Sequence, residues 1–384
     1  MTTVERDEPR WPSWALWIGL GGLALLLIPS TREFYIVEGR RWLYILLLSF
    51  AVAFTLTPVL IRLGIRWGLV DRPSERKIHA TPVPRIGGLA VYLGFVGAIL
   101  INSILEDWMV AILLAGSLLL AVGIVDDARG LPAWLRLGVQ LLGAGMVIYT
   151  GKTLMLFSPG PFGTTANVLL TFLWIVGITN AFNFFDGMDG LAAGMAMLMA
   201  FFMGIVAYET NQPGLAWLAV AVIGSSLGFF FYNFRLDRGE ALIFLGDGGA
   251  TFLGFTLACL AVKGEWADNN PIVSFSNPLL IFGVLIYDMI HITVERIRTG
   301  KVASVKQWID YVGKDHLHHR FARLLGSKRA SVELIFALVT TLGLAAIVLR
   351  KADTTEAILL LAQAALIVII ITIVEHYARR ENEP

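Results

Sequence analysis

Charged residues and cysteine are both scarce in this sequence of 384 residues. Only 15% of the residues are Asp, Glu, Lys or Arg, whereas 57% are hydrophobic; soluble globular domains carry roughly 25% charged residues. The single cysteine, Cys259, rules out an internal disulfide and cannot by itself support a zinc cluster. The net charge of +1 says nothing for a nucleic-acid partner, and we expect none. This composition indicates a polytopic membrane protein.

Long apolar runs divide the chain into predicted membrane spans. A helix needs about 20 apolar residues to cross a bilayer, and the first 13 residues are too polar and mixed in charge for a cleavable signal. We therefore predict an all-α, polytopic protein with 11 or 12 transmembrane helices in one domain, residues 1–384. An extra N-terminal span with its loop would occupy 1–42, a catalytic core 43–350, and an extra C-terminal span with a tail 351–384. The predicted spans are 14–29, 43–65, 87–105, 108–125, 133–150, 167–185, 190–208, 214–232, 242–262, 277–297, 332–349 and 356–375.

Basic residues concentrate on one side of this predicted bundle. With twelve spans, the loops of one side hold seven of the 30 Lys and Arg residues, and the side of both termini holds the remaining 23. Because cytoplasmic loops are enriched in Lys and Arg, we expect both termini in the cytoplasm. The polar clusters described next fall in the cytoplasmic loops 66–86, 126–132, 186–189, 233–241 and 298–331, or at their membrane edges.

Amides and carboxylates interrupt the apolar run that ends near Phe185. In a helix, Asn180 and Asn183 lie one turn apart, and Asn183 and Asp186 do so as well; Asp189 follows, and Gly187 and Gly190 succeed the two acids. Polar groups in such a run normally face the protein interior and mark a functional site. The alternative is a capped helix end, where Asn, Asp and Gly serve the backbone.

Two further acidic positions lie at the same membrane edge. Asp126 and Asp127 end one apolar run, and Asp247 stands among Gly246, Gly248 and Gly249. Adjacent carboxylates repel each other unless a cation lies close by, and Mg²⁺ suits an oxygen-rich site that also holds phosphate. A solvated pair of acids is the alternative for Asp126 and Asp127.

Cationic side chains gather in two of these loops. Lys77 and His79 lie in the proline-stiffened loop 70–88, where cations suit a phosphate or simply a lipid headgroup. Residues 313–321 carry three of the six histidines. A zinc site formed by these histidines would need further ligands from distant parts of the chain. Asp288 and His291, one turn apart, either line the same cavity or pair with each other. The residues of the second loop are His316, His318, His319 and Arg320.

Five ordered motifs between Val70 and Phe321 resemble a known family. They read DRPSERKIHATPVPRIGG, DDARGLPAWLRLGVQ, NAFNFFDGMDGLAAG, FLGDGG and DHLHHRF. The chain resembles the polyprenyl-phosphate N-acetylhexosamine-1-phosphate transferases of glycosyltransferase family 4, especially the undecaprenyl-phosphate N-acetylglucosamine-1-phosphate transferase type. The resemblance implies an enzyme of the bacterial inner (plasma) membrane that transfers a sugar 1-phosphate from a UDP-N-acetylhexosamine to undecaprenyl phosphate and releases UMP. It further implies Mg²⁺ as cofactor, with Mn²⁺ as a substitute, and leaves open whether the chain forms a homodimer.

The resemblance also implies roles for single residues. Asp126 would activate or orient the lipid phosphate beside Asp127, and Asp247 would bind Mg²⁺ together with Asp127 and Asp189. Asp186 and Asp189 would hold the nucleotide end or a water of the metal. His318 is expected among the catalytic residues. The substrate-binding residues would be Lys77, His79, Asn180, Asn183, Asn233, His316, His319 and Arg320.

Two departures from the family pattern bear on the sugar. Ala250 stands where the family often has serine, and the loop before the histidines, GKVASVKQWIDYVGK, is long. The first motif lacks the Thr-Met-Gly-Gly segment of the muramoyl-pentapeptide branch, so a simple UDP-N-acetylhexosamine is the expected donor. An ion-coupled transporter is the alternative of another class, but transporters place polar residues near the bilayer midplane and often show inverted repeats; neither feature is evident here.

Overall fold

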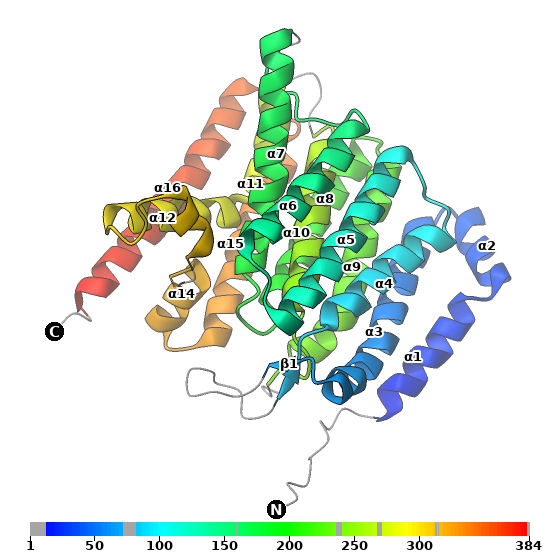
Figure 1. Cartoon of the computed structure of the whole chain (residues 1–384). Coiled ribbons are helices and arrows are strands. Elements are labelled where there is room, and N and C mark those ends of the chain that lie inside the picture. Colours follow the sequence, from blue (N-terminus) through cyan, green and yellow to red (C-terminus); the bar gives the residue numbers. More distant parts are fainter. Residues whose placement is uncertain are drawn as a thin grey trace, which may run out of the picture.

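The computed structural model describes residues 13–71, 82–158, 160–235, 240–266, 271–311, 313 and 315–381. These residues form a bundle of helices with one short pair of strands (Figure 1). The first half contains α1 (Ser13–Leu26), α2 (Pro29–Val37), α3 (Arg41–Trp67), β1 (Val70–Asp71), β2 (Val83–Pro84), α4 (Gly87–Ile101), α5 (Asp107–Arg129), α6 (Ala133–Tyr149) and α7 (Pro161–Phe184). The second half contains α8 (Leu191–Glu209), α9 (Pro213–Asn233), α10 (Gly246–Lys263), α11 (Pro271–Ile281), α12 (Gly283–Arg298), α13 (Val305–Asp310), α14 (Leu317–Leu325), α15 (Lys328–Leu349) and α16 (Thr354–Glu381).

The helices confirm an all-α polytopic membrane protein. Within the described residues, seven helices are long and apolar enough to cross a membrane, or up to nine if two bent pairs each count as one span. Every predicted span coincides with a helix or a bent pair, but α4 and α6 are short, and α10 begins with a polar turn. Length and composition therefore support fewer full spans than the 11 or 12 that the sequence predicts, because short helices are included in that prediction.

Helix α10 lies at the centre of the bundle, packed against α4, α5 and α7. Its side chains from Gly248 to Val262 are buried. Glycines let its neighbours approach at backbone distance: a Cβ on Gly123 of α5 would lie 2.2 Å from the Cα of Gly248, and a Cβ on Gly88 of α4 would lie 2.2 Å from the Cα of Gly249. This close packing places the start of α10 beside the end of α5.

Helices α12, α14 and α16 lie together at one side of the bundle (Figure 1). Helix α12 bends away from α11 by 77° and runs across the bundle in Figure 1, while α16 lies along its outer side. The membrane-spanning part of α16 is only 6% buried. The short helix α14 lies beneath α12 and packs on α15. This group carries the histidine motif.

The two strands are an exception to the all-α prediction. Val70 pairs with Pro84, and Asp71 pairs with Val83, in antiparallel register. Phe244, which precedes α10, donates its backbone N–H to the carbonyl oxygen of Pro84 over 2.8 Å and accepts one from Gly87 over 3.0 Å. These bonds hold the hairpin and the start of α4 against the segment that leads to Asp247.

Candidate active site

The ends of α5 and α10 bring two carboxylates together. The backbone N–H of Asp247 donates a 2.8 Å hydrogen bond to Oδ2 of Asp127. Gly246, just before Asp247, has φ +78°, and a Cβ at this position would lie 2.1 Å from the carbonyl oxygen of Arg85 and 2.7 Å from Oδ2 of Asp127. Glycine is therefore required at residue 246, for both its backbone conformation and the space it leaves.

Two arginines face these acids. Arg85 bridges Asp71 and Asp127, with its Nη2 3.1 Å from Oδ1 of Asp71 and its Nη1 3.6 Å from Oδ1 of Asp127. Arg136 on α6 is 2.9 Å from Oδ2 of Asp126 and 4.0 Å from Oδ2 of Asp247. The side chain of Asp127 is 6% exposed, whereas that of Asp247 is 40% exposed. Asp247 is thus the carboxylate of this pair that a ligand can reach.

Asp126 and Asp127 have different surroundings although they are adjacent in sequence. Both oxygens of Asp126 are engaged, one by Arg136 and the other by the backbone N–H of Leu131. This geometry makes Asp126 the residue that holds Arg136 beside Asp247. The prediction that Asp126 activates the lipid phosphate stays a prediction.

Asp186 joins the acidic pair from the loop after α7. It is partly buried; burial, together with the charges of Asp247 and Asp127, raises the pKa of Asp186 well above its usual range. After burial, the charges of Asp247 and Asp127 are the next causes of this shift, and the charge of Arg85 opposes them. Asp127, Asp186 and Asp247, named as the acidic cluster below, come from three separate elements.

The acidic cluster fits a divalent cation that is completed by a ligand. Among the described residues, no group of three His, Cys, Asp or Glu side chains is arranged to hold a metal ion, and the assignment of Asp127, Asp189 and Asp247 as metal ligands stays a prediction. Mg²⁺ is usually bound through one or two carboxylates plus substrate phosphates. The adjacent acids Asp127 and Asp247, with excess negative charge beside them, meet that requirement.

Asp189 lies at a neighbouring pocket instead. The turn at Gly190, with φ +76°, follows it, and Oδ2 of Asp189 accepts a 3.1 Å hydrogen bond from the backbone N–H of Ala241. The pocket has a volume of about 510 Å³, and its wall also contains Arg235 and Arg329. Asp189 therefore faces a cavity whose wall carries cationic side chains.

The predicted amide residues connect elements of the protein. Asn233 accepts a hydrogen bond from the backbone N–H of Gly190 over 2.8 Å and donates one to the carbonyl oxygen of Ile243 over 2.8 Å. Asn180 and Gln140 of α6 exchange hydrogen bonds through their side chains. Oδ1 of Asn183 is buried and has no hydrogen-bond partner among the described residues. Of these three amides, Asn183 is the one whose side-chain oxygen is unpaired among the described residues.

His318 connects the histidine motif to the loop that carries Asp186. A Cβ on Gly187 would lie 2.6 Å from Nε2 of His318, and neither ring nitrogen of His318 has a hydrogen-bond partner within the described part of the chain. Burial, with the charges of His319, His316 and Arg320, lowers the pKa of His318 well below its usual range. The lowered pKa favours the neutral imidazole, which offers a hydrogen-bonding nitrogen rather than a positive charge.

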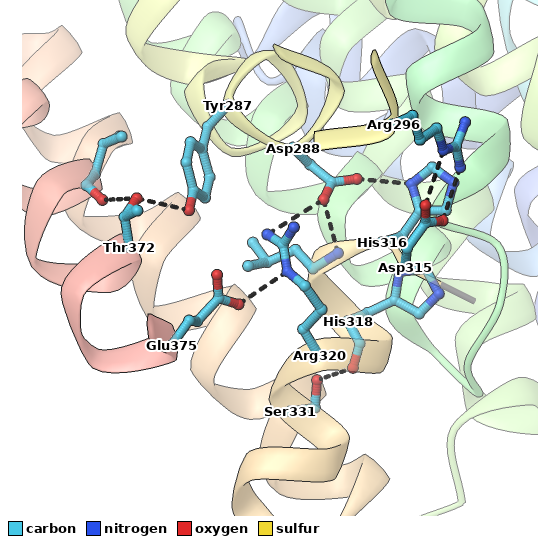
Figure 2. A network of polar contacts seen from close by, with 12 residues as sticks. Tyr287, Asp288, Arg296, Asp315, His316, His318, Arg320, Ser331, Thr372 and Glu375 are labelled. Carbon is cyan, nitrogen blue, oxygen red and sulfur yellow. Dashed lines mark hydrogen bonds and ion pairs between the residues drawn. The ribbon is translucent and has the colours of Figure 1, made fainter. Parts of the chain in front are cut away.

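The other residues of the motif are tied to α12 and α16. His316 is bonded to Asp288, and Arg320 to Glu375 and Asp288 (Figure 2). Asp288 pairs with His316, and the alternatives for Asp288 and His291, a shared cavity or a pair with each other, stay predictions. His319 lies with its ring centroid 4.2 Å from that of His318.

Two predicted residues have no described position, and two ionic contacts near the histidine motif were not predicted. Lys77 and His79 lie outside the described residues. Glu375 was not foreseen, because a single acid near the end of the last apolar run has no distinguishing local pattern. The pair of Arg296 with Asp315, joined by bonds of 2.8 and 2.7 Å, was not foreseen either; although burial opposes ionisation, Arg296 keeps the pKa of Asp315 below its usual range.

Comparison with known proteins identifies the family of the chain. The sequence profile described as Glycosyl transferase family 4 matches residues 109–265. A probable undecaprenyl-phosphate N-acetylglucosaminyl 1-phosphate transferase of Bacillus subtilis (strain 168) is 37% identical over 313 residues, which cover 80% of this chain and 84% of the relative. The chain belongs to glycosyl transferase family 4. The family resemblance drawn from the five motifs is thereby confirmed.

Two other relatives extend the comparison within glycosyl transferase family 4. A decaprenyl-phosphate N-acetylglucosaminephosphotransferase of Mycobacterium tuberculosis (strain ATCC 25618 / H37Rv) is 32% identical over 308 residues, 71% of this chain and 74% of the relative. An undecaprenyl-phosphate alpha-N-acetylglucosaminyl 1-phosphate transferase of Escherichia coli (strain K12) is 28% identical over 289 residues, 73% of this chain and 77% of the relative. The relatives' names include no transporter, so the transporter alternative has no support.

Proposed function

We propose that this chain transfers N-acetylglucosamine 1-phosphate from UDP-N-acetylglucosamine to a polyprenyl phosphate, undecaprenyl phosphate in the first instance, and releases UMP. The observation that carries the proposal is the meeting of Asp127 and Asp247, joined by a 2.8 Å hydrogen bond, at one end of a membrane-embedded bundle. The names of the similar proteins support the same reaction.

The reaction joins two phosphates. An oxygen of the lipid phosphate attacks the β-phosphorus of the UDP-sugar, a new P–O–P bond forms to the lipid, and the bond between the α and β phosphates breaks as UMP departs. A phosphomonoester has a second pKa of about 6, so the lipid phosphate is largely dianionic at neutral pH. A protein base is therefore helpful rather than obligatory.

The protein supplies positioning and charge for this transfer. When bound, Mg²⁺ would supply positive charge to the diphosphate oxygens, and Asp127 and Asp247 would hold it. Arg136, within 4.0 Å of Asp247, places a guanidinium at the same site, where it can donate to phosphate oxygens. The neutral His318 can hydrogen-bond a phosphate oxygen or the leaving UMP.

The pocket of about 510 Å³ beside Asp189 is the proposed place of the nucleotide. Arg235 and Arg329 belong to its wall, and Arg329 also lies 4.9 Å from the ring centroid of Phe234. Aromatic, cationic and carboxylate groups in one cavity suit a base, a phosphate and a ribose hydroxyl respectively. Asp189 would then contact the nucleoside rather than the metal.

The active site is proposed to face the cytoplasm of a bacterial cell. The support is the excess of Lys and Arg on this side of the bundle, 23 of the 30 in the chain by the twelve-span assignment. UDP-sugars are cytoplasmic metabolites, so this orientation also gives the donor access. The plasma membrane is the corresponding location.

The experiment is a transfer assay with the full-length protein purified in detergent. Radiolabelled UDP-N-acetylglucosamine, undecaprenyl phosphate and Mg²⁺ should yield a labelled lipid and stoichiometric UMP, and EDTA should abolish both. Asp247→Asn serves as the inactive control. Absence of labelled lipid with every UDP-N-acetylhexosamine and with the UDP-muramoyl-pentapeptide would reject the proposal. Activity with the pentapeptide donor alone would move the chain to the other branch of the family.

A further inference from the structure

Arg320 connects three helices through two buried ionic contacts. Its Nε donates a 2.9 Å hydrogen bond to Oε1 of Glu375 on α16, and its Nη2 lies 3.6 Å from Oδ1 of Asp288 on α12 (Figure 2). All three residues are buried, with Asp288 at 0% exposure, Arg320 at 5% and Glu375 at 6%. A guanidinium so placed has a counter-ion on either side.

Asp288 in turn holds the start of the histidine helix. Its Oδ2 is 2.7 Å from Nδ1 of His316, and its Oδ1 accepts a 2.7 Å hydrogen bond from the backbone N–H of Leu317, the first residue of α14. A carboxylate on one imidazole nitrogen sets the ring orientation and directs the other nitrogen outward. Asp288 therefore fixes both the helix and the imidazole that precedes it.

His316 adjoins the segment that carries Asp186, one member of the acidic cluster. Its ring stacks on Phe184, with 5.0 Å between centroids, and Phe184 ends α7 two residues before Asp186. Its ring also lies 6.0 Å from that of His318, which touches Gly187. A displacement of His316 would thus shift Phe184 or His318, and through them the position of Asp186.

Glu375 is exceptional on its own helix. The large apolar side chains of α16 nearby, Ile369, Ile370, Ile373 and Val374, are all exposed at 50% or more, as expected for a helix that faces lipid. A carboxylate buried in such a helix is costly unless it is paired. Its pairing with Arg320 therefore marks one point at which α16 engages the rest of the protein, together with the hydrogen bond between Thr372 and Tyr287.

We propose that Glu375 is a positioning residue of the transferase, acting through Arg320 and Asp288 to orient His316. This inference rests on the proposed function for its catalytic part. Glu375 shares the charge of Arg320, which leaves Asp288 available to His316 and to the N–H of Leu317. Without Glu375, Arg320 has Asp288 as its remaining buried carboxylate and competes for the oxygens that hold α14. The C-terminal helix is then a part of the active-site scaffold.

The first test measures whether Glu375 holds α14, and it requires no enzyme activity. Glu375→Gln retains a hydrogen-bond acceptor for Arg320 but removes the charge. Hydrogen–deuterium exchange of the full-length protein in nanodiscs should become at least about tenfold faster in peptides that cover α14. The matched control is Glu209→Gln, which removes the ion pair of Glu209 with Arg350 in a different part of the chain and should leave α14 unchanged. Equal exchange in α14 of the wild type and Glu375→Gln would overturn the proposal.

The second test asks whether the loosened helix matters for turnover. In the assay with UDP-N-acetylglucosamine and undecaprenyl phosphate, Glu375→Gln should lower kcat about tenfold or more, which is the effect of changing a residue that orients a functional group. The KM for the nucleotide sugar should change less than about twofold. Saturation binding of UMP gives the concentration of folded sites in each preparation, so that kcat is expressed per folded site. The double variant Arg320→Gln, Glu375→Gln should be no slower than Arg320→Gln alone, because the two residues act as a unit.

The two tests separate the possible failures. Faster exchange in α14 with a wild-type kcat would limit Glu375 to a structural role and overturn the catalytic part, as would a fall in kcat that matches the loss of UMP-binding sites. An inactive wild type would reject the proposed function, while the exchange measurement would still decide whether Glu375 holds α14.

Discussion

Asp127 accepts a 2.8 Å hydrogen bond from the backbone N–H of Asp247, although 120 residues separate the two in the sequence. The bond uses one carboxylate oxygen of Asp127 and leaves the side chain of Asp247, 40% exposed, directed at the site. The neighbouring acid Asp126 is bonded to Arg136 and to the backbone N–H of Leu131, and its side chain also lies beside that of Asp247. Three acids of similar chemistry therefore have three distinct environments.

These environments predict different effects of removing each charge. Asp127→Asn and Asp247→Asn should each lower kcat by at least about 100-fold. Each should also weaken Mg²⁺ affinity and so raise the Mg²⁺ concentration that gives half the maximal rate, because it removes a charge proposed to hold the cation. The measurement is a Mg²⁺ titration of UMP release for each variant.

Asp126→Asn is the comparison for that experiment. It should mainly lower thermal stability and raise KM, because the residue positions Arg136. A Mg²⁺ titration of Asp127→Asn and Asp247→Asn that matches the wild type, with normal turnover, would refute the metal assignment.

Gly187→Ala should disrupt the site by steric overlap. The added Cβ would lie 2.6 Å from Nε2 of His318, so the imidazole must move, at a cost of about 1–3 kcal/mol. We expect kcat to fall at least about tenfold. Gly177→Ala on α7 is the matched control, because a Cβ there meets nothing within 4 Å. Full activity of Gly187→Ala would show that the position of His318 is unimportant.

Gly88→Ala should separate α4 from α10. A Cβ on Gly88 would lie 2.2 Å from the Cα of Gly249, and backbone cannot yield as a flexible side chain does. Thermal unfolding in detergent should show a Tm several degrees lower, together with reduced activity. Gly97→Ala on the same helix, where a Cβ meets nothing within 4 Å, should keep or slightly raise the Tm. Similar melting of the two variants would contradict the close packing of α4 on α10.

His318 should make the folded state sensitive to acid. Its pKa is lowered well below 6.5 by burial and by the neighbouring cationic groups, whereas the unfolded chain has the usual value near 6.5. Below pH 6.5 the unfolded state binds the extra proton, so stability falls by up to about 1.4 kcal/mol per pH unit until the folded pKa is reached. The Tm of the wild type should drop between pH 7 and pH 5.5 more than that of His318→Asn. Identical pH profiles would show that His318 is not buried as a neutral imidazole.

Local patterns account for the elements and for the choice of candidate residues. Apolar runs such as those of α5 and α16 are read directly from hydropathy, and Asp127, Asp186 and Asp247 stand out because acids at the end of such runs are costly. The lengths were less certain: α4 and α6 are shorter than full spans, since the ends of a helix depend on packing and loops as much as on composition. Glu375 has no distinguishing local pattern, because an acid near the end of an apolar run is ordinary without its partner.

The sequence by itself determined that this is a helical membrane protein and that its polar clusters lie at one membrane edge, because the cost of burying polar groups in lipid acts on each segment separately. Only the tertiary structure decided which carboxylates meet. Asp186 lies near Asp127 and Asp247, and Arg320 turns toward Glu375, because these choices depend on how closely glycine-lined helices approach and on which direction a turn gives a side chain. Those distances are set between segments far apart in the chain, so no local pattern encodes them.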